Sequence, residues 1–207
     1  MPSDPLELPD HPFKAYIFDC DGTIADTMPA HFKAWTRAME ELGGTFPEDL
    51  FYSWGGKPTT VIVRQLNEIY GTQLDVETTP VIKERYFAEL IPEVLPIEPV
   101  VALVKKFHGI APLAVASGGH RDIVIKTLDA LGLTQYFDAI VGMEDVEHGK
   151  PAPDPFLEAA RRLGVAPADC LVFEDSPTGI EAARAAGMLY VLVPTPAIAT
   201  SAPPPAA

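Results

Sequence analysis

The fold is decided by the stretch Ala15-Tyr16-Ile17-Phe18-Asp19-Cys20-Asp21-Gly22-Thr23, in which a short apolar strand ends at two carboxylates. Like charges at this spacing raise each other's cost of ionisation unless a cation lies between them or one acid keeps its proton. Mg²⁺ is the cation that we expect, because it is a hard ion that prefers oxygen ligands. The pair Asp19 and Asp21 therefore predicts a site for chemistry at the end of this strand.

Short apolar runs alternate with helical patterns from about residue 100 onward. This alternation is typical of βαβ units and a parallel sheet. The runs are continuously apolar rather than alternating, as expected for strands that are buried on both faces. The sequence therefore predicts an α/β fold with a Rossmann-like parallel-sheet core, whose later strands cover residues 113–116, 139–141, 170–173 and 189–193.

Residues 29–93 interrupt this alternation with three helical patterns and need no strand. The third helix is expected to follow Thr79-Pro80, with Thr79 as its cap and Pro80 in its first turn; Val81 and Ile82 are expected on its apolar face. An all-helical cap inserted after the first strand explains the pattern. Ligands of open α/β sheets bind beyond the carboxyl ends of the strands, so this insert is expected over the site. The predicted organisation is a catalytic core over residues 13–28 and 94–195, a cap over 29–93, and flexible ends over 1–12 and 196–207.

Composition limits the possible partners. The 207 residues include 15 Lys and Arg against 29 Asp and Glu, which gives a formal net charge of -14. Nucleic acid and anionic membranes need a basic footprint, so neither is an expected partner.

Cys20 and Cys170 are interpreted as thiols that fill the core, and no secretory or membrane segment is evident, so a reduced, cytoplasmic setting is expected. Nothing in the sequence indicates an oligomer, and a monomer is expected.

Four motifs in order resemble those of the haloacid dehalogenase-like phosphohydrolases. They are Asp19-x-Asp21-x-Thr23, Ser117 at the end of an apolar run, Lys150 within Gly149-Lys150-Pro151-Ala152-Pro153-Asp154, and Glu174-Asp175 at the end of another apolar run. The resemblance covers roughly residues 14–193, and the helical insert is similar to the cap of the β-phosphoglucomutase-like branch.

By this resemblance Asp19 is the nucleophile that becomes phosphorylated, and Asp21 is the general acid and base. Mg²⁺ is the implied cofactor, bound by the carboxylates of Asp19 and Asp175 and by the backbone carbonyl of Asp21. Glu174 is implied to hold metal-bound waters rather than to bind the ion itself.

The resemblance also implies which residues bind phosphate. Lys150 and Ser117 would bind the oxygens on which charge develops during transfer. From the residues alone, Ser117 could equally be a helix cap. Gly118 adds a backbone amide that can approach a phosphate closely.

Four residues of the predicted insert are candidates for substrate specificity: His31, Trp35, Gly56 and Lys57. The stretch from Asp26 to Trp35 is similar to sugar-phosphate-acting members of the family. The segment Trp54-Gly55-Gly56-Lys57-Pro58 resembles the substrate-facing loop of the cap. Lys57 would there meet a carboxylate, a hydroxyl or a second phosphate.

The predicted activity is Mg²⁺-dependent hydrolysis of a small sugar phosphate through an aspartyl-phosphate. The alternative is a β-phosphoglucomutase-like phosphohexomutase. Such mutases place an arginine three residues after the glycine of the cap loop, where this chain has Thr59; threonine does not replace a bidentate clamp. The segment Gly56-x-Pro58-Thr59 instead resembles bacterial fructose-1-phosphate and 6-phosphogluconate phosphatases.

Two further classes fit the residues less well. A haloacid dehalogenase needs neither the second aspartate nor the Glu174-Asp175 pair. A binding module without activity would be expected to lose one of the four motif residues Asp19, Asp21, Lys150 and Asp175, and all of them are present.

Overall fold

The computed structural model describes residues 6–55 and 57–194. These residues divide into two compact units. The core unit comprises residues 6–27 and 91–193, and the cap unit comprises residues 28–90. The candidate Gly56 lies outside the described residues, as do residues 1–5 and 195–207, which include the predicted C-terminal flexible end.

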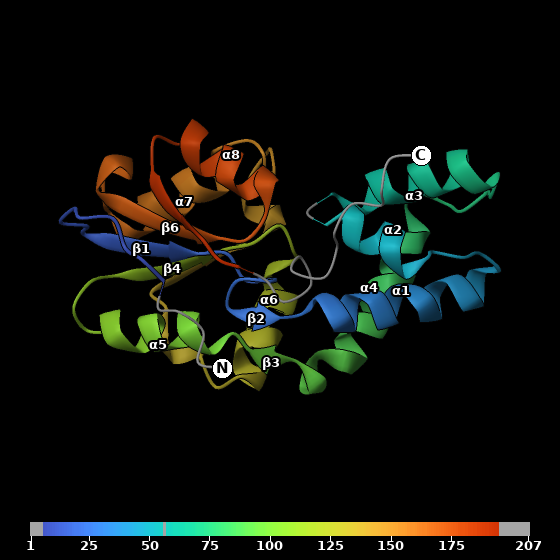
Figure 1. Cartoon of the computed structure of the whole chain (residues 1–207), viewed down its shortest axis with the longest axis horizontal. Helices are drawn as coiled ribbons and strands as arrows, with labels where there is room; N and C mark the ends of the chain where they lie inside the picture. The colour runs from blue at the N-terminus through green and yellow to red at the C-terminus, as the bar shows by residue number, and fades with distance from the viewer. Residues whose placement is uncertain (1–5, 56, 195–207) are drawn as a thin grey trace, which may run out of the picture. The chain divides into compact units, whose positions relative to one another are not determined.

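The core unit contains a parallel sheet (Figure 1). Its strand order is β5-β4-β1-β6-β7, so the first strand of the chain lies at the centre. Tyr16 in β1 pairs with Leu113 in β4 and with Leu171 in β6. The predicted α/β fold is confirmed, and the strands are β1 (Ala15–Phe18), β4 (Leu113–Ala116), β5 (Ala139–Val141), β6 (Cys170–Glu174) and β7 (Leu189–Leu192).

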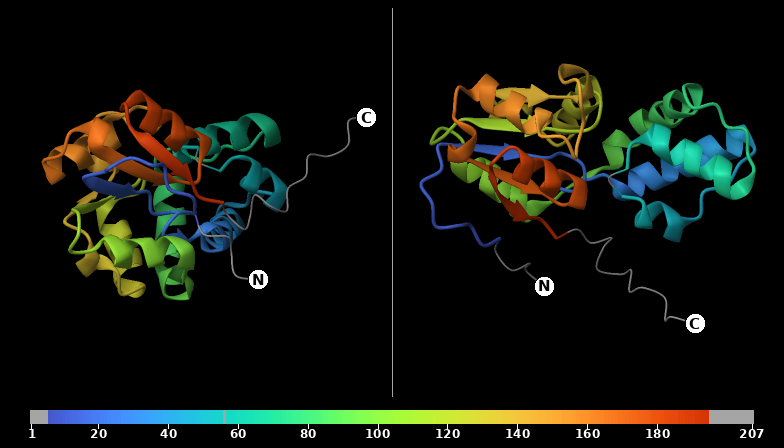
Figure 2. Two further views of the ribbon diagram at one scale, coloured as in Figure 1. Left: turned by 60° about the vertical axis from the view of Figure 1, so that its left-hand side comes forward. Right: turned by 90° about the horizontal axis from the view of Figure 1, so that it is seen from above.

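Helices cover both faces of this sheet (Figure 2). On one face α5 (Glu98–Phe107) and α6 (Arg121–Ala130) pack in a cluster that includes Phe18. On the other, α7 (Asp154–Leu163) and α8 (Pro177–Ala185) pack in a cluster that includes Ile17. Successive side chains of a strand point to opposite faces, so both faces of β1 must be apolar. This explains why its sequence is continuously hydrophobic.

The chain leaves and re-enters the core unit through two short strands that lie side by side. β2 (Ala25–Asp26) and β3 (Leu95–Pro96) pair antiparallel. This pairing holds the two ends of the inserted segment together. The remaining short elements of the core unit are the 3₁₀ turns η1 (Ile91–Glu93), η2 (Thr134–Tyr136), η3 (Met143–Asp145) and η4 (Pro167–Asp169).

The cap unit is helical, and its described residues form no strand. Its helices are α1 (Met28–Leu42), α2 (Glu48–Ser53), α3 (Thr59–Tyr70) and α4 (Thr78–Leu90). The six-residue α2 was not among the three predicted helices, because it is too short to show a helical period. Its buried Phe51 joins the aromatic core around Phe46.

The predicted start of α4 was wrong, and its predicted apolar face was right only in part, since Ile82 packs against the cap core and Val81 does not. Thr79 does not cap the helix but lies within it and is fully buried. Asp75 is the cap, since its Oδ1 accepts the Thr78 N–H at 2.7 Å. Val81 is 67% exposed, and the buried face instead carries Lys83 and Phe87.

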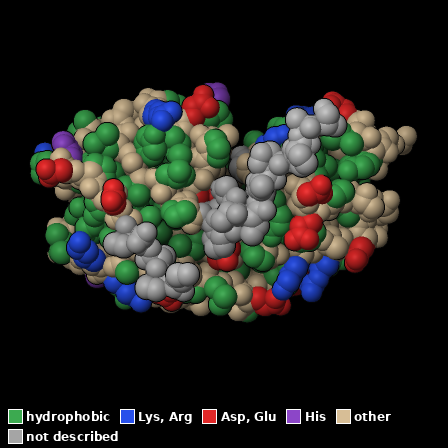
Figure 3. All heavy atoms as spheres, in the orientation of Figure 1, with side chains coloured by type: hydrophobic (Ala, Val, Ile, Leu, Met, Phe, Trp, Pro, Cys, Tyr) green, Lys and Arg blue, Asp and Glu red, His purple; other side chains and the backbone are tan. Residues whose placement is uncertain are grey.

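Other features of the described residues concern the ends and the surface. Leu6 and Leu8, within the segment predicted to be flexible, pack against the α5 and α6 side of the core. Cys20 and Cys170 are buried free thiols. None of the helices described is long and apolar enough to span a membrane. On the face drawn in Figure 3, basic side chains lie scattered among acidic ones.

Candidate active site

The parallel strands bring the predicted site residues of the core unit to one edge of the sheet. Asp19 directly follows β1, Ser117 directly follows β4, and Glu174 and Asp175 lie at the end of β6. The carboxyl ends of parallel strands meet at the same edge, which is where open α/β sheets bind ligands. Lys150, from the segment between η3 and α7, completes the group by bonding to Asp19 and Glu174.

Asp19 is the most enclosed of these acids. Its backbone N–H donates to the Phe173 carbonyl at 2.9 Å, which ties it to β6. Its side chain is 8% exposed, and Oδ1 accepts a hydrogen bond from the Lys150 ammonium at 2.6 Å. Oδ2 is buried and has no hydrogen-bond partner among the described residues. Burial, together with the charge of Glu174, raises the pKa of Asp19 well above its usual value.

Lys150 is the ammonium group that balances these acids. Nζ lies 2.6 Å from Asp19 Oδ1 and 2.7 Å from Glu174 Oε2, and the side chain is 9% exposed. Burial by itself would lower the pKa of Lys150, but the two carboxylates outweigh it and raise the pKa. The ammonium therefore stays charged and is held beside Asp19, where it can neutralise an oxyanion.

Glu174 uses both of its oxygens within the protein. Oε2 accepts from Lys150, and Oε1 accepts the Asp175 N–H at 3.1 Å, the Ser176 N–H at 2.9 Å and the Ser176 hydroxyl at 2.8 Å. Its carboxylate lies against Gly179, where an added Cβ would be 2.0 Å from Cδ. Burial would raise the pKa of Glu174, but Lys150 and Ser176 lower it. Glu174 therefore fixes Lys150 relative to the start of α8.

The acids have the composition of a site for a divalent cation. Oxygens from Asp19, Glu174 and Asp175 lie within 4.8 Å of one another. Burial and the charge of Glu174 raise the pKa of Asp175 to about 7, so this carboxyl is held in an environment that disfavours its charge. A hard cation would remove that penalty and would give the orphaned Asp19 Oδ2 a partner. The residues present therefore fit Mg²⁺.

A tight turn places Asp21 beside this group. The N–H groups of Ile24 and Ala25 both donate to the Cys20 carbonyl, at 2.9 and 3.0 Å. Gly22 has a φ of +83°, a backbone conformation that residues with a side chain rarely adopt. An added Cβ at Gly22 would lie 2.4 Å from Asp175 Oδ2. The glycine thus allows both the turn and the close approach of Asp175.

Ser117 and Asp21 face each other. Ser117 is buried, with 1% of the residue exposed, and its Oγ lies 3.4 Å from Asp21 Oδ2. Ser117 Oγ also accepts the Gly119 N–H at 3.0 Å, so it closes a local turn as well. Gly118 is exposed, and an added Cβ there would meet nothing within 4 Å. Both readings of Ser117, a turn-closing residue and a polar group in the site, are therefore compatible with its contacts.

The predicted substrate residues of the cap unit have different environments. His31 stacks on Phe87 at 3.8 Å, and its Nδ1 lies 2.8 Å from Lys83 Nζ. Lys57 donates to Gln65 at 2.9 Å. Trp35, by contrast, is 2% exposed within the aromatic core, so its indole has a packing role in this unit rather than the predicted substrate contact.

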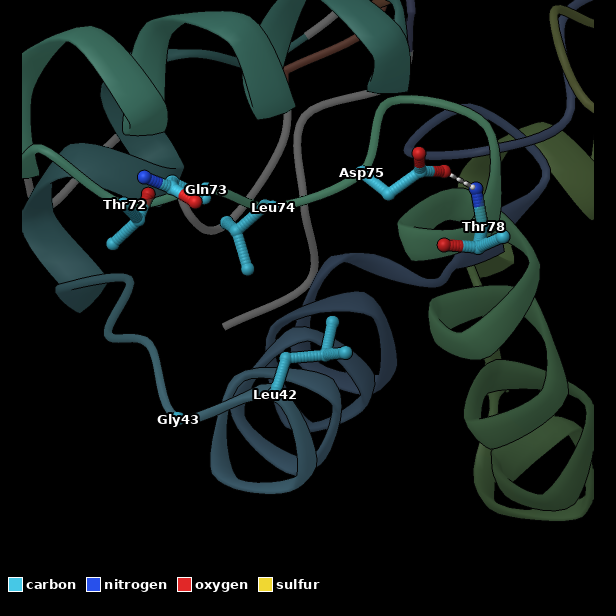
Figure 4. A pocket seen from close by; sticks show the side chains of 7 residues that line it. All are labelled: Leu42, Gly43, Thr72, Gln73, Leu74, Asp75 and Thr78. Carbon is cyan, nitrogen blue, oxygen red and sulfur yellow. Dashed lines mark hydrogen bonds between the residues drawn. The ribbon is translucent and has the colours of Figure 1, made fainter.

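The cap unit also has a hollow of its own (Figure 4). It is lined by the end of α1 at Leu42 and Gly43 and by the segment that leads into α4. Among the described residues of its lining, Asp75 is the one that carries a charge, and its Oδ1 already accepts the backbone amides of Glu77 and Thr78. This hollow therefore lacks the group of acids and a lysine that marks the core unit.

Three residues with clear roles in the site were not singled out from sequence. Because they have no Cβ, Gly22 leaves room for the Asp175 carboxylate and Gly179 leaves room for the Glu174 carboxylate. Thr23 Oγ1 donates to Asp175 Oδ1 at 3.2 Å. Gly22 and Thr23 lie in the first motif, which was the available signal. Gly179 had no signal, because its closeness to Glu174 depends on how α8 begins after β6.

A model of the haloacid dehalogenase-like hydrolase family matches residues 13–187, and the chain belongs to this family. The parallel sheet, the inserted helical unit and the group of acids around Lys150 are the features expected of an α/β hydrolase of this family. The resemblance found in the four motifs is thus confirmed.

Individual relatives include phosphatases. The chain is 42% identical over 179 residues to the fructose-1-phosphate phosphatase YqaB of Escherichia coli, covering 85% of this chain and 94% of the relative. It is 34% identical over 179 residues to a phosphorylated carbohydrates phosphatase of Thermotoga maritima, covering 84% and 82%. A putative β-phosphoglucomutase structure from Thermotoga maritima superposes with a TM-score of 0.68 at 29% identity, covering 90% of each chain.

Proposed function

We propose that this protein is a Mg²⁺-dependent phosphatase, a phosphoric monoester hydrolase that acts on a small sugar phosphate through an aspartyl-phosphate. The observation that carries the proposal is the geometry around Asp19. One of its oxygens is bonded to Lys150, and the other is buried beside Glu174 and Asp175 with no hydrogen-bond partner among residues 6–55 and 57–194. The named phosphatases among the relatives support the same reaction class.

Asp19 is the proposed nucleophile. A carboxylate oxygen of Asp19 forms a bond to phosphorus while the bond from phosphorus to the leaving sugar oxygen breaks. Lys150 orients Asp19 and favours its ionised form, although burial and the charge of Glu174 outweigh this effect and still raise the pKa of Asp19. Water then attacks the phosphorus of the aspartyl-phosphate, which regenerates Asp19 and releases inorganic phosphate.

Asp21 is the proposed proton carrier. It lies two residues after Asp19 and is partly exposed, so it can exchange protons with substrate and solvent. In the first step its protonated carboxyl gives a proton to the leaving alkoxide. In the second step the resulting carboxylate accepts a proton from the attacking water, which restores the starting state.

The remaining residues bind charge. Lys150 and Ser117 would hold the non-bridging phosphate oxygens, with the exposed amide segment at Gly118 beside them. Asp19, Asp175 and the backbone carbonyl of Asp21 would hold Mg²⁺, with the Glu174 carboxylate beside them. When bound, the ion would neutralise phosphate charge as a Lewis acid.

We favour hydrolysis over phosphoryl transfer between sugar hydroxyls. Thr59 occupies the position of the arginine clamp that the mutases use, and fructose-1-phosphate phosphatase activity is the activity named for a relative at 42% identity. The substrate class is therefore a sugar phosphate of the fructose 1-phosphate or 6-phosphogluconate type. In the cap unit, His31 and Lys57 are the proposed substrate contacts.

The proposal also concerns the setting of the enzyme. A small phosphorylated metabolite is the proposed partner, and nucleic acid and membranes are not, because the chain carries a net charge of -14. Two buried free thiols suit a reduced, cytoplasmic setting. We propose that the enzyme acts as a monomer.

The test combines a substrate panel with one variant. Phosphate release from fructose 1-phosphate, 6-phosphogluconate and p-nitrophenyl phosphate is measured with Mg²⁺ and with a chelator. Asp19→Asn should fold and should lose activity by roughly 10⁴-fold or more, the scale of removing a covalent nucleophile. Activity close to that of wild type in the variant would refute the aspartyl-phosphate.

Phosphorus NMR separates hydrolysis from mutase activity. A hexose 1-phosphate incubated with enzyme, Mg²⁺ and a trace of hexose bisphosphate should give mainly inorganic phosphate. Predominant conversion to hexose 6-phosphate would show that the chain is a mutase and that Thr59 does not prevent the transfer.

A further inference from the structure

The loop that follows Ser117 is hydrogen-bonded to η3, the 3₁₀ turn after β5. α6 begins at Arg121, and the side chain of the preceding His120 makes no capping hydrogen bond. The Arg121 N–H instead donates to both carboxylate oxygens of Glu144, each at 3.1 Å. An acid from another element therefore does the work of the helix cap.

Backbone contacts reinforce this arrangement. The Met143 N–H donates to the Gly119 carbonyl at 2.9 Å. Gly142 lies so close to α6 that an added Cβ would be 2.5 Å from the Arg121 nitrogen. Asp145 stiffens the turn itself, because its Oδ2 accepts the Gly142 N–H at 2.9 Å. Residues 142–145 thus form one rigid support for the start of α6.

The support reaches Ser117 through Gly119. The carbonyl of Gly119 is bonded to the Met143 N–H, and the N–H of Gly119 donates to Ser117 Oγ at 3.0 Å. The Ser117 hydroxyl is therefore oriented by an amide that the support holds in place. A serine Oγ can occupy three staggered positions about the Cα–Cβ bond, and this contact, with the one to Asp21, favours the position observed.

We propose that Glu144 is a positioning residue for the reaction: by accepting the first amide of α6, it keeps the Gly119 N–H on Ser117 Oγ and so fixes the hydroxyl that binds the substrate phosphate. This inference rests on the proposed phosphatase function. Glu144 touches neither Asp19 nor Lys150 in the contacts described, so its effect should appear in phosphate binding rather than in the chemical step.

The test uses Glu144→Ala, the conservative Glu144→Gln and a matched control. Asp75→Ala is the control, because Asp75 Oδ1 likewise accepts amides at a helix start, but in the cap unit. For each protein, kcat and KM are measured with p-nitrophenyl phosphate, together with the inhibition constant of inorganic phosphate and the thermal midpoint. A side-chain amide still offers one acceptor oxygen, so Glu144→Gln should retain the contact.

Glu144→Ala should raise KM and the inhibition constant of phosphate by about 10-fold, since a hydrogen bond to a charged group is worth at least that factor. Its kcat should change less than about 3-fold, because binding is lost equally before and during transfer. Glu144→Gln should recover most of the loss, and Asp75→Ala should change only the thermal midpoint.

Three results would overturn the proposal. They are an unchanged KM and phosphate inhibition in Glu144→Ala, a loss in Glu144→Gln as large as in Glu144→Ala, and an equal loss of phosphate binding in Asp75→Ala. An inactive wild-type protein would instead contradict the proposed phosphatase function.

Discussion

Gly22 offers the sharpest test of the site, because two separate requirements meet at one residue. Its φ of +83° is unfavourable for any residue with a side chain. In addition, a Cβ at this position would lie 2.4 Å from Asp175 Oδ2 and 2.8 Å from Asp175 Cγ. Gly22→Ala should therefore cost stability through the backbone and cost activity through Asp175.

The two effects have different sizes. The left-handed conformation should destabilise the protein by about 1–2 kcal/mol, which lowers the melting temperature by a few degrees. Relief of the contact requires Asp175 Oδ2 to move by roughly 1 Å to reach ordinary van der Waals distance. A displacement of this size in a catalytic site costs on the order of 100-fold in rate. The Mg²⁺ concentration for half-maximal activity should rise as well.

Gly109→Ala is the matched control. Gly109 lies in the same unit and has φ of +75°, but an added Cβ there would meet nothing within 4 Å. Both variants should melt at similar temperatures, and only Gly22→Ala should lose kcat/KM with p-nitrophenyl phosphate. Equal activity in the two variants would refute the reasoning that Gly22 makes room for Asp175.

Three further predictions concern other contacts. Thr23→Val removes the donor to Asp175 and should raise the Mg²⁺ concentration for half activity by about 5-fold, as read from a Mg²⁺ titration. Gly179→Ala places a Cβ 2.0 Å from Cδ of Glu174; it should reduce kcat/KM by roughly 100-fold, and unchanged kinetics would contradict the proposed role of Glu174 in holding the lysine. Hydrogen bonds from two neighbouring arginines lower the pKa of Glu158 from its usual 4.5 to about 2. The ionised Glu158 should therefore stabilise the fold above pH 4.5 and lose this effect as the pH falls toward 2. In urea unfolding, Glu158→Gln should be about 1 kcal/mol less stable than wild type at pH 7, a value reduced for solvent screening, and a constant difference down to pH 2 would argue against the ion pair.

The sequence predicted the core unit well for a physical reason. Strands buried on both faces must be continuously apolar, so a polar residue that ends such a run is conspicuous. Asp19 was singled out in this way, directly after β1; Ser117 and Asp175 likewise follow β4 and β6, but their proposed roles came from the resemblance. Lys150 precedes α7 in a segment with no strand, and it was found only through the resemblance of its motif.

The cap unit was predicted less well because its buried face is not purely apolar. Lys83 is 4% exposed, with its ammonium 2.8 Å from His31 Nδ1 and 2.7 Å from Glu84. A helical pattern treats lysine as a surface residue, so the predicted apolar face of α4 omitted Lys83 and included the exposed Val81. The contacts that bury Lys83 come partly from α1, 52 residues earlier in the chain, and no local pattern reveals them.

The balance of charge in the site explains why the acids alone could not perform the proposed reaction. Four acids gather at this site in the described part of the chain, and the ammonium of Lys150 bonds to two of them, Asp19 and Glu174; the others are Asp21 and Asp175. A phosphate monoester brings further negative charge, and in a buried site this repulsion is only weakly screened. Glu174 gives both its oxygens to Lys150 and the start of α8, and its negative charge raises the pKa values of Asp19 and Asp175 further. The raised pKa values of Asp19 and Asp175 express the same imbalance. A divalent cation between these two acids would offset this repulsion and so favour the binding of phosphate before any chemistry begins.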